Sequence, residues 1–446
     1  MKQIHISAKP IYIPSRYKED IYQLFLLAEQ EFSSCFFFES LGEHGMLSRY
    51  SILGFDPKHT IIGKEKSVMV DTKKISTHNA YAFLQKIMPQ DKVARNYAGG
   101  LVGYLGYDAM NLFESSLAIR SHPLFPQFMF DVYTDGVIYD KYTGELTYFY
   151  YDENRLSLIL SLLKKVVFKK KIHIRALRAD TTKKEHAVQV KQVKEEILKG
   201  NTFQTVIGIQ HEFSYTGDAV VLYDRLRKVN PSPFMYFFKS GDIRIIGASP
   251  ELLFGMRDKQ MQTFPLAGTI KRGKTAHEDM DFAYQLLTDP KERAEHSMLI
   301  DLHRNDMGKV ARFGSVKVKT LMDIKRFSHV QHIGSEIVGL LGRGEDMFSA
   351  VAANFPAGTL TGAPKIASMK LIDRMEKSPR GPYGGGIGHF GFNGDCTFSI
   401  PIRTIFLSGN DGFTQAGSGI VADSTAEKEY DEVQRKLAAM KEVLGV

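Results

Sequence analysis

Apolar strand patterns that follow one another directly are the feature of this sequence that most constrains its fold. They cover residues 128–139 and 146–151 in the first half, and 205–213, 234–238 and 243–246 in the second. Strands in such hairpin-like succession pair antiparallel, because a parallel pair needs a long crossover between its strands. We therefore expect an α+β protein with mainly antiparallel sheets.

Helical patterns lie outside these runs of strands, and some of their ends carry clear signals. We expect helices at residues 21–30, 154–168, 184–199, 290–299, 364–375 and 426–444. Gly200 follows the third of them, where glycine commonly ends a helix. Asp289 and Pro290 open the fourth as an N-cap and a first-turn proline.

The positive charge of the chain is concentrated in one segment. The 446 residues carry a formal net charge of +8, and the window Lys164–Lys191 holds ten basic and two acidic residues, which accounts for the whole excess. A nucleic-acid-binding face is normally assembled from several elements, so we expect no nucleic-acid partner. We interpret the segment as a solvated connector over residues 166–183, between an N-terminal lobe (1–165) and a C-terminal domain (184–446).

Cysteine usage and hydropathy limit the setting in which the protein works. Cys35 and Cys396 are isolated, which indicates neither a disulfide framework nor a zinc site. The first ten residues lack the apolar core of a signal peptide, and no run of about 18 apolar residues predicts a membrane helix. We expect a cytoplasmic protein without a membrane partner.

Two helix beginnings carry glutamates three residues apart, a spacing that places both on one helix face. Glu292 and Glu295 form the first pair, Glu429 and Glu432 the second, and residues 424–427 read as a capping box. Acids at a first turn are explained by the helix dipole alone. The alternative is a magnesium site, because Mg²⁺ takes a few carboxylates and completes its shell with water and substrate oxygens.

Three further features indicate anion chemistry. A Gly/Thr loop, residues 354–365, precedes a helix whose beginning can receive an anion. Arg403 lies in an apolar strand and needs a carboxylate partner, either a ligand or an internal acid. His329 and His332 are either structural or suited to proton transfer near neutral pH. Together these patterns predict a Mg²⁺-assisted enzyme that acts on a small anion.

In order along the chain, the motifs resemble those of the chorismate-utilising enzymes, and most closely the large subunits of anthranilate synthases. The resemblance spans nearly the whole sequence and implies the layered α/β/β/α sandwich of that family. The matching motifs are Gly247–Glu251, Pro265–Thr269, Glu292–His296 with Asp301–Asp306, the Thr359 loop, Gly381–Tyr383, Arg403 and Gly417–Ser424.

The resemblance also implies roles for individual residues. Glu295 and Glu432 hold Mg²⁺, with Glu292 and Glu429 nearby. Glu251 acts as the general acid on the departing ring hydroxyl, and His332, with Thr359, assists the later loss of pyruvate. The implied chorismate-binding residues are Gly268, Thr269, Tyr383, Arg403, Gly417, Ser418, Gly419 and Lys436.

Two positions distinguish reactions within the family. Gln204 stands where the relatives that add water carry a lysine base, and a neutral amide cannot deprotonate water. Ala267 stands where many 4-amino-4-deoxychorismate synthases carry a nucleophilic lysine. Both favour the conversion of chorismate and ammonia to anthranilate and pyruvate, with Mg²⁺ as cofactor. The alternatives are 4-amino-4-deoxychorismate synthase component I and, from another class, a non-catalytic basic binding protein.

The resemblance further implies regulation and a partner. Ser40, with Pro233, Phe234 and Met235 opposite, corresponds to the site where tryptophan acts as feedback inhibitor, unless these segments only pack the two halves together. Neither cysteine lies in a glutaminase nucleophile motif. We therefore expect a separate glutamine amidotransferase subunit that supplies ammonia in a hetero-oligomer.

Overall fold

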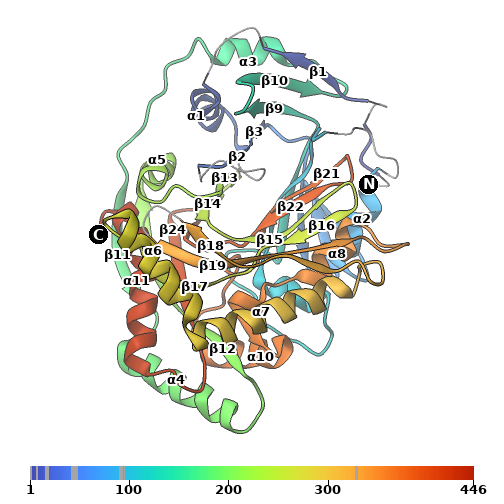
Figure 1. Ribbon diagram of the computed structural model, residues 1–446. Coiled ribbons are helices and arrows are strands. Elements are labelled where there is room, and N and C mark those ends of the chain that lie inside the picture. Colours follow the sequence, from blue (N-terminus) through green and yellow to red (C-terminus); the bar gives the residue numbers. More distant parts are fainter. Residues whose placement is uncertain are drawn as a thin grey trace.

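The computed structural model describes residues 3–6, 9–15, 20–41, 49–89, 94, 96–326 and 330–446. Within them, two twelve-stranded sheets form the framework, and every strand pairing is antiparallel (Figure 1). This confirms the expected α+β class with mainly antiparallel sheets. His329 lies outside the described residues.

The first sheet joins strands from both ends of the chain. Its order is β1 (Ile11–Pro14), β10 (Glu145–Tyr150), β9 (Asp135–Asp140), β3 (Tyr50–Phe55), β2 (Ser34–Glu39), β13 (Phe234–Ser240), β14 (Ile243–Ser249), β23 (Thr404–Ser408), β24 (Asp411–Ile420), β12 (Gln204–Thr216) and β11 (His173–Ala179), with β20 (Gly362–Ala363) paired to β12. Early strands therefore lie on one side of this sheet and late strands occupy its middle.

The second sheet mixes the two halves of the chain in the same way. Its order is β17 (Leu266–Lys271), β19 (Val330–Leu340), β16 (Gln260–Thr263), β15 (Leu252–Arg257), β22 (Cys396–Ser399), β21 (Gly386–Gly391), β7 (Gly100–Leu105), β8 (Phe128–Tyr133), β4 (His59–Lys64), β5 (Ser67–Val70) and β6 (Lys73–Ser76), with β18 (Lys317–Arg326) paired to β19. Both sheets thus run across the boundary between the expected lobe and domain, and that division stays a prediction.

Helices flank the two sheets. They are α1 (Ile21–Glu31), α2 (Ala80–Ile87), α3 (Leu156–Leu162), α4 (Lys183–Leu198), α5 (Val220–Val229), α6 (Ala276–Thr288), α7 (Pro290–Gly308), α8 (Met347–Asn354), α9 (Gly358–Thr361), α10 (Lys365–Met375) and α11 (Ala426–Leu444), besides the 3-10 helix η2 (Tyr107–Leu112). Helices α1, α5 and α11 pack on the first sheet, and α2, α6, α7 and α8 on the second.

The main hydrophobic core lies between the sheets. Tyr236, Phe238 and Phe406 of the first sheet share one buried cluster with Phe130 and Phe390 of the second. A second core lies on the other face of the first sheet, under α1, α5 and α11. This order of layers confirms the α/β/β/α sandwich. Among the described residues, no helix is both long and apolar enough to span a membrane.

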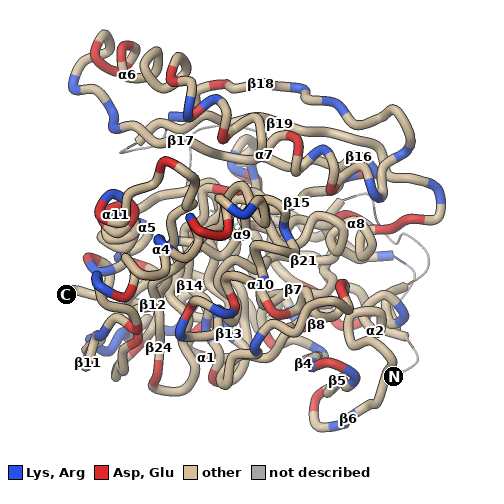
Figure 2. Tube along the Cα trace, turned by 90° about the horizontal axis from the view of Figure 1, so that it is seen from below, with Lys and Arg blue, Asp and Glu red and all other residues tan. Residues whose placement is uncertain are grey.

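Part of the basic segment, which the sequence suggests is a solvated connector, forms regular secondary structure. Residues 173–179 form β11, the edge strand of the first sheet, whose side chains are mostly exposed. Figure 2 shows basic residues along this strand, at one end of the molecule. Helix α4 follows, and Gly200 adopts φ +77 just beyond its end, as expected from its position in the sequence.

Candidate active site

The glycine-rich end of β24 forms one wall of the candidate site. Antiparallel register places Val206 of β12 beside Gly419, and Gly208 beside Gly417. A Cβ atom at Gly419 would lie 2.5 Å from Nε2 of Gln204, so the buried amide of Gln204 packs directly on this glycine. The absence of side chains here brings the backbone of β24 to the surface of the site.

Ser418 lies between these two glycines, and its side chain is on the opposite face of the strand. It pairs with Ile207, which belongs to a small core with residues of α4 and α10. Its hydroxyl is fully buried and has no hydrogen-bond partner among the described residues. Ser418 can therefore contact a ligand on the glycine face only through its backbone.

Glu251 follows β14 and meets Thr359 of the short helix α9. The Thr359 hydroxyl donates a hydrogen bond of 2.9 Å to Glu251 Oε1. Burial raises the pKa of Glu251 from its usual 4.5 to about 7, although the hydrogen bond and the charges of Lys436 and Arg403 oppose the shift. The carboxyl is therefore partly protonated at neutral pH and can act as an acid.

His332, on β19, lies against the turn of β17. Its Nδ1 atom is 2.8 Å from the carbonyl oxygen of Gly268 and 3.1 Å from the hydroxyl of Thr269. Because a carbonyl oxygen only accepts, Nδ1 carries the proton and Nε2 is the acceptor nitrogen of the ring. Burial lowers the pKa of His332 to about 4, helped by the charges of Arg403 and Lys436. The imidazole is therefore neutral at pH 7.

Arg403 directly precedes β23 in a left-handed backbone conformation, φ +50. Within the described part of the chain, its guanidinium forms no ion pair with an internal acid. Burial lowers its pKa below the usual value, and the nearby Glu251 opposes that shift. Of the two partners expected from the sequence, a ligand carboxylate is the one that this arrangement favours.

Tyr383 and Lys436 approach the same glycine. Lys436 donates a hydrogen bond of 2.8 Å to the carbonyl oxygen of Gly417 and forms an ion pair of 2.8 Å with Glu432. Burial raises the pKa of Tyr383, while the charge of Arg380 and the backbone of Gly417 oppose the rise. The structure thus brings these predicted residues together around Gly417.

The four predicted metal-site glutamates face one another from α7 and α11. Burial raises the pKa of Glu295 to about 7; Lys291 opposes the rise, and the charges of Glu292, Glu432 and Glu429 add to it. No three ligand side chains in the described residues converge in metal-binding geometry. Two carboxylates whose mutual repulsion a cation would relieve nevertheless fit Mg²⁺, which commonly takes only one or two from the protein.

The beginning of α11 differs from the capping box expected at residues 424–427. Thr425 is the N-cap, and its side chain makes no capping hydrogen bond. The hydroxyl of Ser424 instead donates 2.7 Å to Glu429, a buried side chain. The capping-box prediction is therefore wrong, because Ser424 lies one residue before the cap and reaches the acid five residues on.

The two segments expected to bind tryptophan lie side by side. Met235 of β13 pairs with Glu39 of β2, and the backbone N–H of Leu41 donates 2.9 Å to the carbonyl of Ser232. Ser40 is buried, and its hydroxyl has no partner among the described residues. Pro233 and the partly exposed Phe234 lie at the start of β13, next to Ser40.

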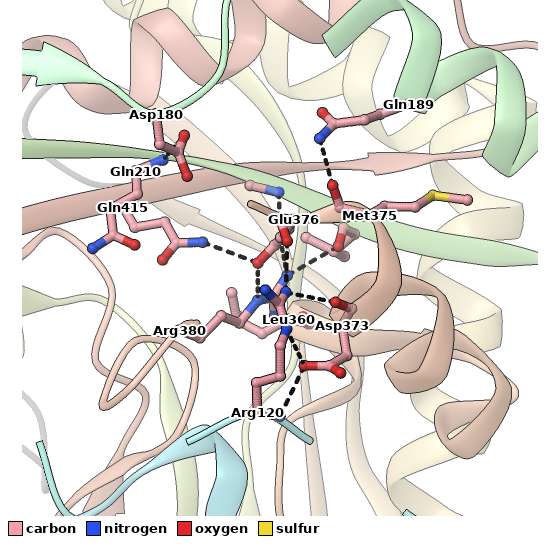
Figure 3. Close-up of polar contacts among 12 residues, drawn as sticks. Arg120, Asp180, Gln189, Gln210, Leu360, Asp373, Met375, Glu376, Arg380 and Gln415 are labelled. Atoms are coloured by element: carbon pink, nitrogen blue, oxygen red, sulfur yellow. Dashed lines mark hydrogen bonds and ion pairs between the residues drawn. The ribbon is translucent and has the colours of Figure 1, made fainter. Parts of the chain in front are cut away.

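Arg380 and Glu376 are functional candidates that the sequence alone did not indicate. This fully buried ion pair is 2.7 Å long (Figure 3), and the guanidinium of Arg380 lies over the ring of Tyr383. Arg380 donates to the carbonyls of Leu360 and Val206, and Glu376 accepts from the backbone of Gly208. The pair therefore connects the Thr359 loop to the strand that carries Gln204.

The sequence pattern of the chorismate-binding enzymes matches residues 33–442. That match covers nine-tenths of the chain, which brings together an acid, a neutral imidazole and a guanidinium that has no ion-pair partner among the described residues. The chain belongs to the chorismate-binding enzyme family. It is therefore an enzyme of the chorismate-utilising type.

Named relatives and a solved structure show which members of the family the chain resembles. "Anthranilate synthase component 1" of Leptospira biflexa is 48% identical over 454 aligned positions, which cover 100% of this chain and 98% of the relative. "Aminodeoxychorismate synthase component 1" of Bacillus subtilis is 36% identical, with 89% of each chain covered. The crystal structure of anthranilate synthase component I from Streptococcus pneumoniae superposes with a TM-score of 0.77 at 30% identity, over 90% of this chain and 93% of that one.

Proposed function

We propose that this enzyme converts chorismate and ammonia to anthranilate and pyruvate, the first step of tryptophan synthesis. The observation that carries the proposal is Gln204. Its neutral amide packs on Gly419, at the position where water-adding family members need a basic lysine. Ammonia is a nucleophile in its own neutral form and needs no such base. The name of the Leptospira biflexa relative supports the same activity.

In the first step, ammonia adds to the ring and the ring hydroxyl leaves as water. Glu251 supplies the proton that the hydroxyl needs, because its raised pKa keeps a share of the carboxyl protonated at neutral pH. Thr359 orients this carboxyl through its hydrogen bond. The product of the step is an aminodeoxyisochorismate.

In the second step, the ring loses a proton and its enolpyruvyl group leaves as the enolate of pyruvate, which takes up a proton at its methylene carbon; the ring becomes the aromatic amine. Neutral His332 is the base, with Nδ1–H held by the carbonyl of Gly268 and Nε2 as the proton acceptor. Thr269 fixes the ring from the same side. The lowered pKa keeps the imidazole of His332 unprotonated across the neutral range, at the cost of making it a weaker base than an ordinary histidine.

Charged and backbone groups hold the two carboxylates of chorismate. Arg403 suits one of them as a two-pronged donor. Glu295 and Glu432, with Glu292 and Glu429 nearby, would hold Mg²⁺, which supplies electrostatic stabilisation of the other carboxylate when bound. Tyr383, Lys436 and the backbone at Gly417 and Gly419 line the remaining wall.

Two further parts of the proposal concern regulation and supply. Tryptophan binds at Ser40 and Pro233–Met235, where the buried hydroxyl of Ser40 lacks an internal partner among the described residues. A separate glutamine amidotransferase subunit delivers ammonia, because the two cysteines of this chain are both buried and isolated. Without that subunit, the enzyme uses ammonium salts.

The second candidate is 4-amino-4-deoxychorismate synthesis, the activity named for the Bacillus subtilis relative. Against it, Ala267 on β17 offers no nucleophile to the ring. One experiment decides between the two. Purified enzyme is incubated with chorismate, Mg²⁺ and ammonium, the product is identified by mass spectrometry, and tryptophan is then added. We expect anthranilate, whose formation tryptophan suppresses; accumulation of aminodeoxychorismate would refute the proposal.

A further inference from the structure

A cavity lies beyond the candidate active site, on the same side of β12 and β24. Its volume is about 510 Å³, and it opens between the loop at residues 122–125, β11, β12 and β24. The residues that determine its chemistry are His122, Phe125, Arg178, Gln210, Glu212 and Phe413. None of these residues belongs to the site described above.

Gln210 lies in the wall of this cavity, and Gln415 lies next to it on β24, outside the lining. Gln210 and Gln415 are direct partners across β12 and β24, so their side chains lie on the same face (Figure 3). They are 2% and 3% exposed, and Oε1 of each has no hydrogen-bond partner among the described residues. The amide nitrogen of Gln415 donates 3.2 Å to Glu376, which fixes the direction of its oxygen. Two buried acceptors therefore need a donor.

The charged and aromatic groups around the cavity favour a positively charged hydrogen-bond donor. Arg178 is already paired with Glu212 at 3.0 Å, and Asp411 adds another carboxylate to the lining. His122 stacks on Phe413 with 5.1 Å between ring centroids, and burial lowers its pKa to about 4, so it brings no positive charge at pH 7. Aromatic faces and carboxylates both favour a small cation.

We propose that this cavity is where ammonia, taken up as the ammonium ion, first binds to the enzyme, with Gln210 and Gln415 as its hydrogen-bond acceptors. The inference rests on the proposed function, in which ammonia is the co-substrate. Ammonium has four N–H donors and no acceptor, which matches a site built from unpartnered oxygens. A neutral ligand with acceptors of its own would leave the two amide oxygens only partly satisfied.

The position of the cavity suits this role. Gly417 and Gly419 follow Gln415 by two and four residues on β24, and even spacing keeps all three on one face. At about 3.4 Å per residue, the glutamines lie roughly 7 to 14 Å from the glycine wall of the candidate active site. The Arg380–Glu376 pair occupies the space between them and contacts both Gln415 and Gly208. Ammonium gives up one proton to water at the mouth of the cavity, and the ammonia that forms then passes the Arg380–Glu376 pair to reach Gln204, roughly 20 Å along β12 from Gln210.

The test replaces Gln210 with Met, which keeps the length of the side chain and removes the acceptor. No hydrogen bond of the Gln210 side chain to another described residue is lost. We expect the KM for ammonium at saturating chorismate to rise about fivefold, as for one lost hydrogen bond, while the KM for chorismate stays the same.

Two further variants serve as controls. Gln210→Glu keeps an acceptor and should keep the ammonium KM low. Gln189→Met is the control outside the cavity: Gln189 is also buried with an unpartnered oxygen among the described residues, and its amide nitrogen donates 2.7 Å to the carbonyl of Met375.

A second measurement does not depend on turnover. Ammonium chloride should raise the melting temperature of the parent chain more than sodium chloride at equal ionic strength, and the difference should vanish in Gln210→Met. The same variant is then measured in the complex with the amidotransferase subunit. If the glutamine-dependent rate of Gln210→Met falls as well, ammonia from glutamine and added ammonium both use the cavity. If only the ammonium-dependent rate falls, the cavity serves added ammonium alone. An unchanged ammonium KM in Gln210→Met, or an equal rise in Gln189→Met, would overturn the proposal. An ammonium effect on melting without any anthranilate would instead count against the proposed function alone.

Discussion

At the scale of single residues, the protonation of Glu251 controls the first step. Its pKa of about 7 means that the acid form decreases as the pH rises through neutrality, so kcat/KM should fall on the alkaline side. Glu251→Gln cannot donate a proton, and we expect its activity to drop by about 10² to 10⁴ and to lose this pH dependence. Steady-state rates between pH 5.5 and 9 measure both effects.

Thr359→Val and the pH dependence of stability serve as controls for the assignment of Glu251. Thr359→Val removes the hydrogen bond that lowers the pKa of Glu251, so its alkaline limb should move to higher pH. The folded-state pKa of Glu251 is raised above its usual 4.5, so its contribution to stability is present below about pH 4.5 and is lost as the pH rises through 7. Glu251→Gln should therefore lose less stability than the parent between pH 5 and 8. An inactive variant that is also unfolded at pH 7 would contradict the assignment.

His332 should act only in the second step. In His332→Asn, the amide N–H can still bind the carbonyl of Gly268, but the proton acceptor is gone. We expect chorismate to be consumed and an aminodeoxyisochorismate to accumulate, with anthranilate formation reduced about 100-fold or more. Mass spectrometry of quenched reactions identifies the product. Anthranilate formation at the parental rate would rule out the role of His332.

At the scale of elements, helices α7 and α11 form one functional unit because their glutamates face each other. Glu295→Gln or Glu432→Gln should reduce activity by more than 10- to 100-fold, which is the typical loss when a residue that only hydrogen-bonds to a metal ligand is replaced. Glu427→Gln, an exposed change on α11, is the matched control. Mg²⁺ should raise the melting temperature of the parent and of Glu427→Gln, and of neither site variant. A site variant that still responds to Mg²⁺ in the same way would disprove the metal assignment.

The same helices predict how pH affects the metal. Protons compete with Mg²⁺ for Glu295, whose pKa is about 7. The apparent affinity for Mg²⁺ should therefore rise as the pH increases through 7 and level off above it. Calorimetric titration with Mg²⁺ at pH 6, 7 and 8 measures the trend, and an affinity that falls with increasing pH would be inconsistent with it.

Strands β2 and β13 form the unit proposed to bind tryptophan. Ser40→Ala removes the buried hydroxyl, and we expect the tryptophan concentration for half-inhibition to rise about 5- to 10-fold, as for one hydrogen bond. Ser34→Ala, at the other end of β2, is the control. Rates of anthranilate formation against tryptophan concentration measure the change. Equal inhibition of both variants would indicate that the segments only pack the halves together.

Local patterns predict some of these elements well and others poorly. Helix α11 matches its expected bounds because its apolar spacing and final glycine are local signals. The strand in the basic segment was missed because β11 forms through pairing with β12, which no local pattern reveals. The family motifs identified Glu251, His332 and Arg403, which the structure places together. The sequence does not predict a role for Arg380 and Glu376, because charged residues just after a helix are usually exposed to solvent. They are buried only because Tyr107 and β12 pack around them.

At the scale of the whole molecule, the two sheets should unfold together. Strand β21 pairs with β7 in the second sheet, and β13 pairs with β2 in the first, so neither half can leave without breaking both sheets. We expect a single calorimetric transition for the intact chain. The fragment 184–446 expressed alone should lack cooperative unfolding, because its strands lose their neighbours. Two separate transitions, or a folded fragment, would show instead that the predicted lobe and domain are independent.

Because strands from the two halves of the chain pair with each other, early strands cannot pair fully until late strands have been synthesised. Strand β2 ends at Glu39 and its partner β13 begins at Phe234, 195 residues later; β7 waits longer, for β21 near the C-terminus. At a synthesis rate of about 5–20 residues per second, the ribosome needs roughly 10–40 s to produce the first partner. During that interval the aromatic strand Cys35–Phe38 is exposed with an open edge, which is a hazard for aggregation. Newly made chains of this enzyme should therefore depend on chaperones that shield the N-terminal strands until translation is nearly complete.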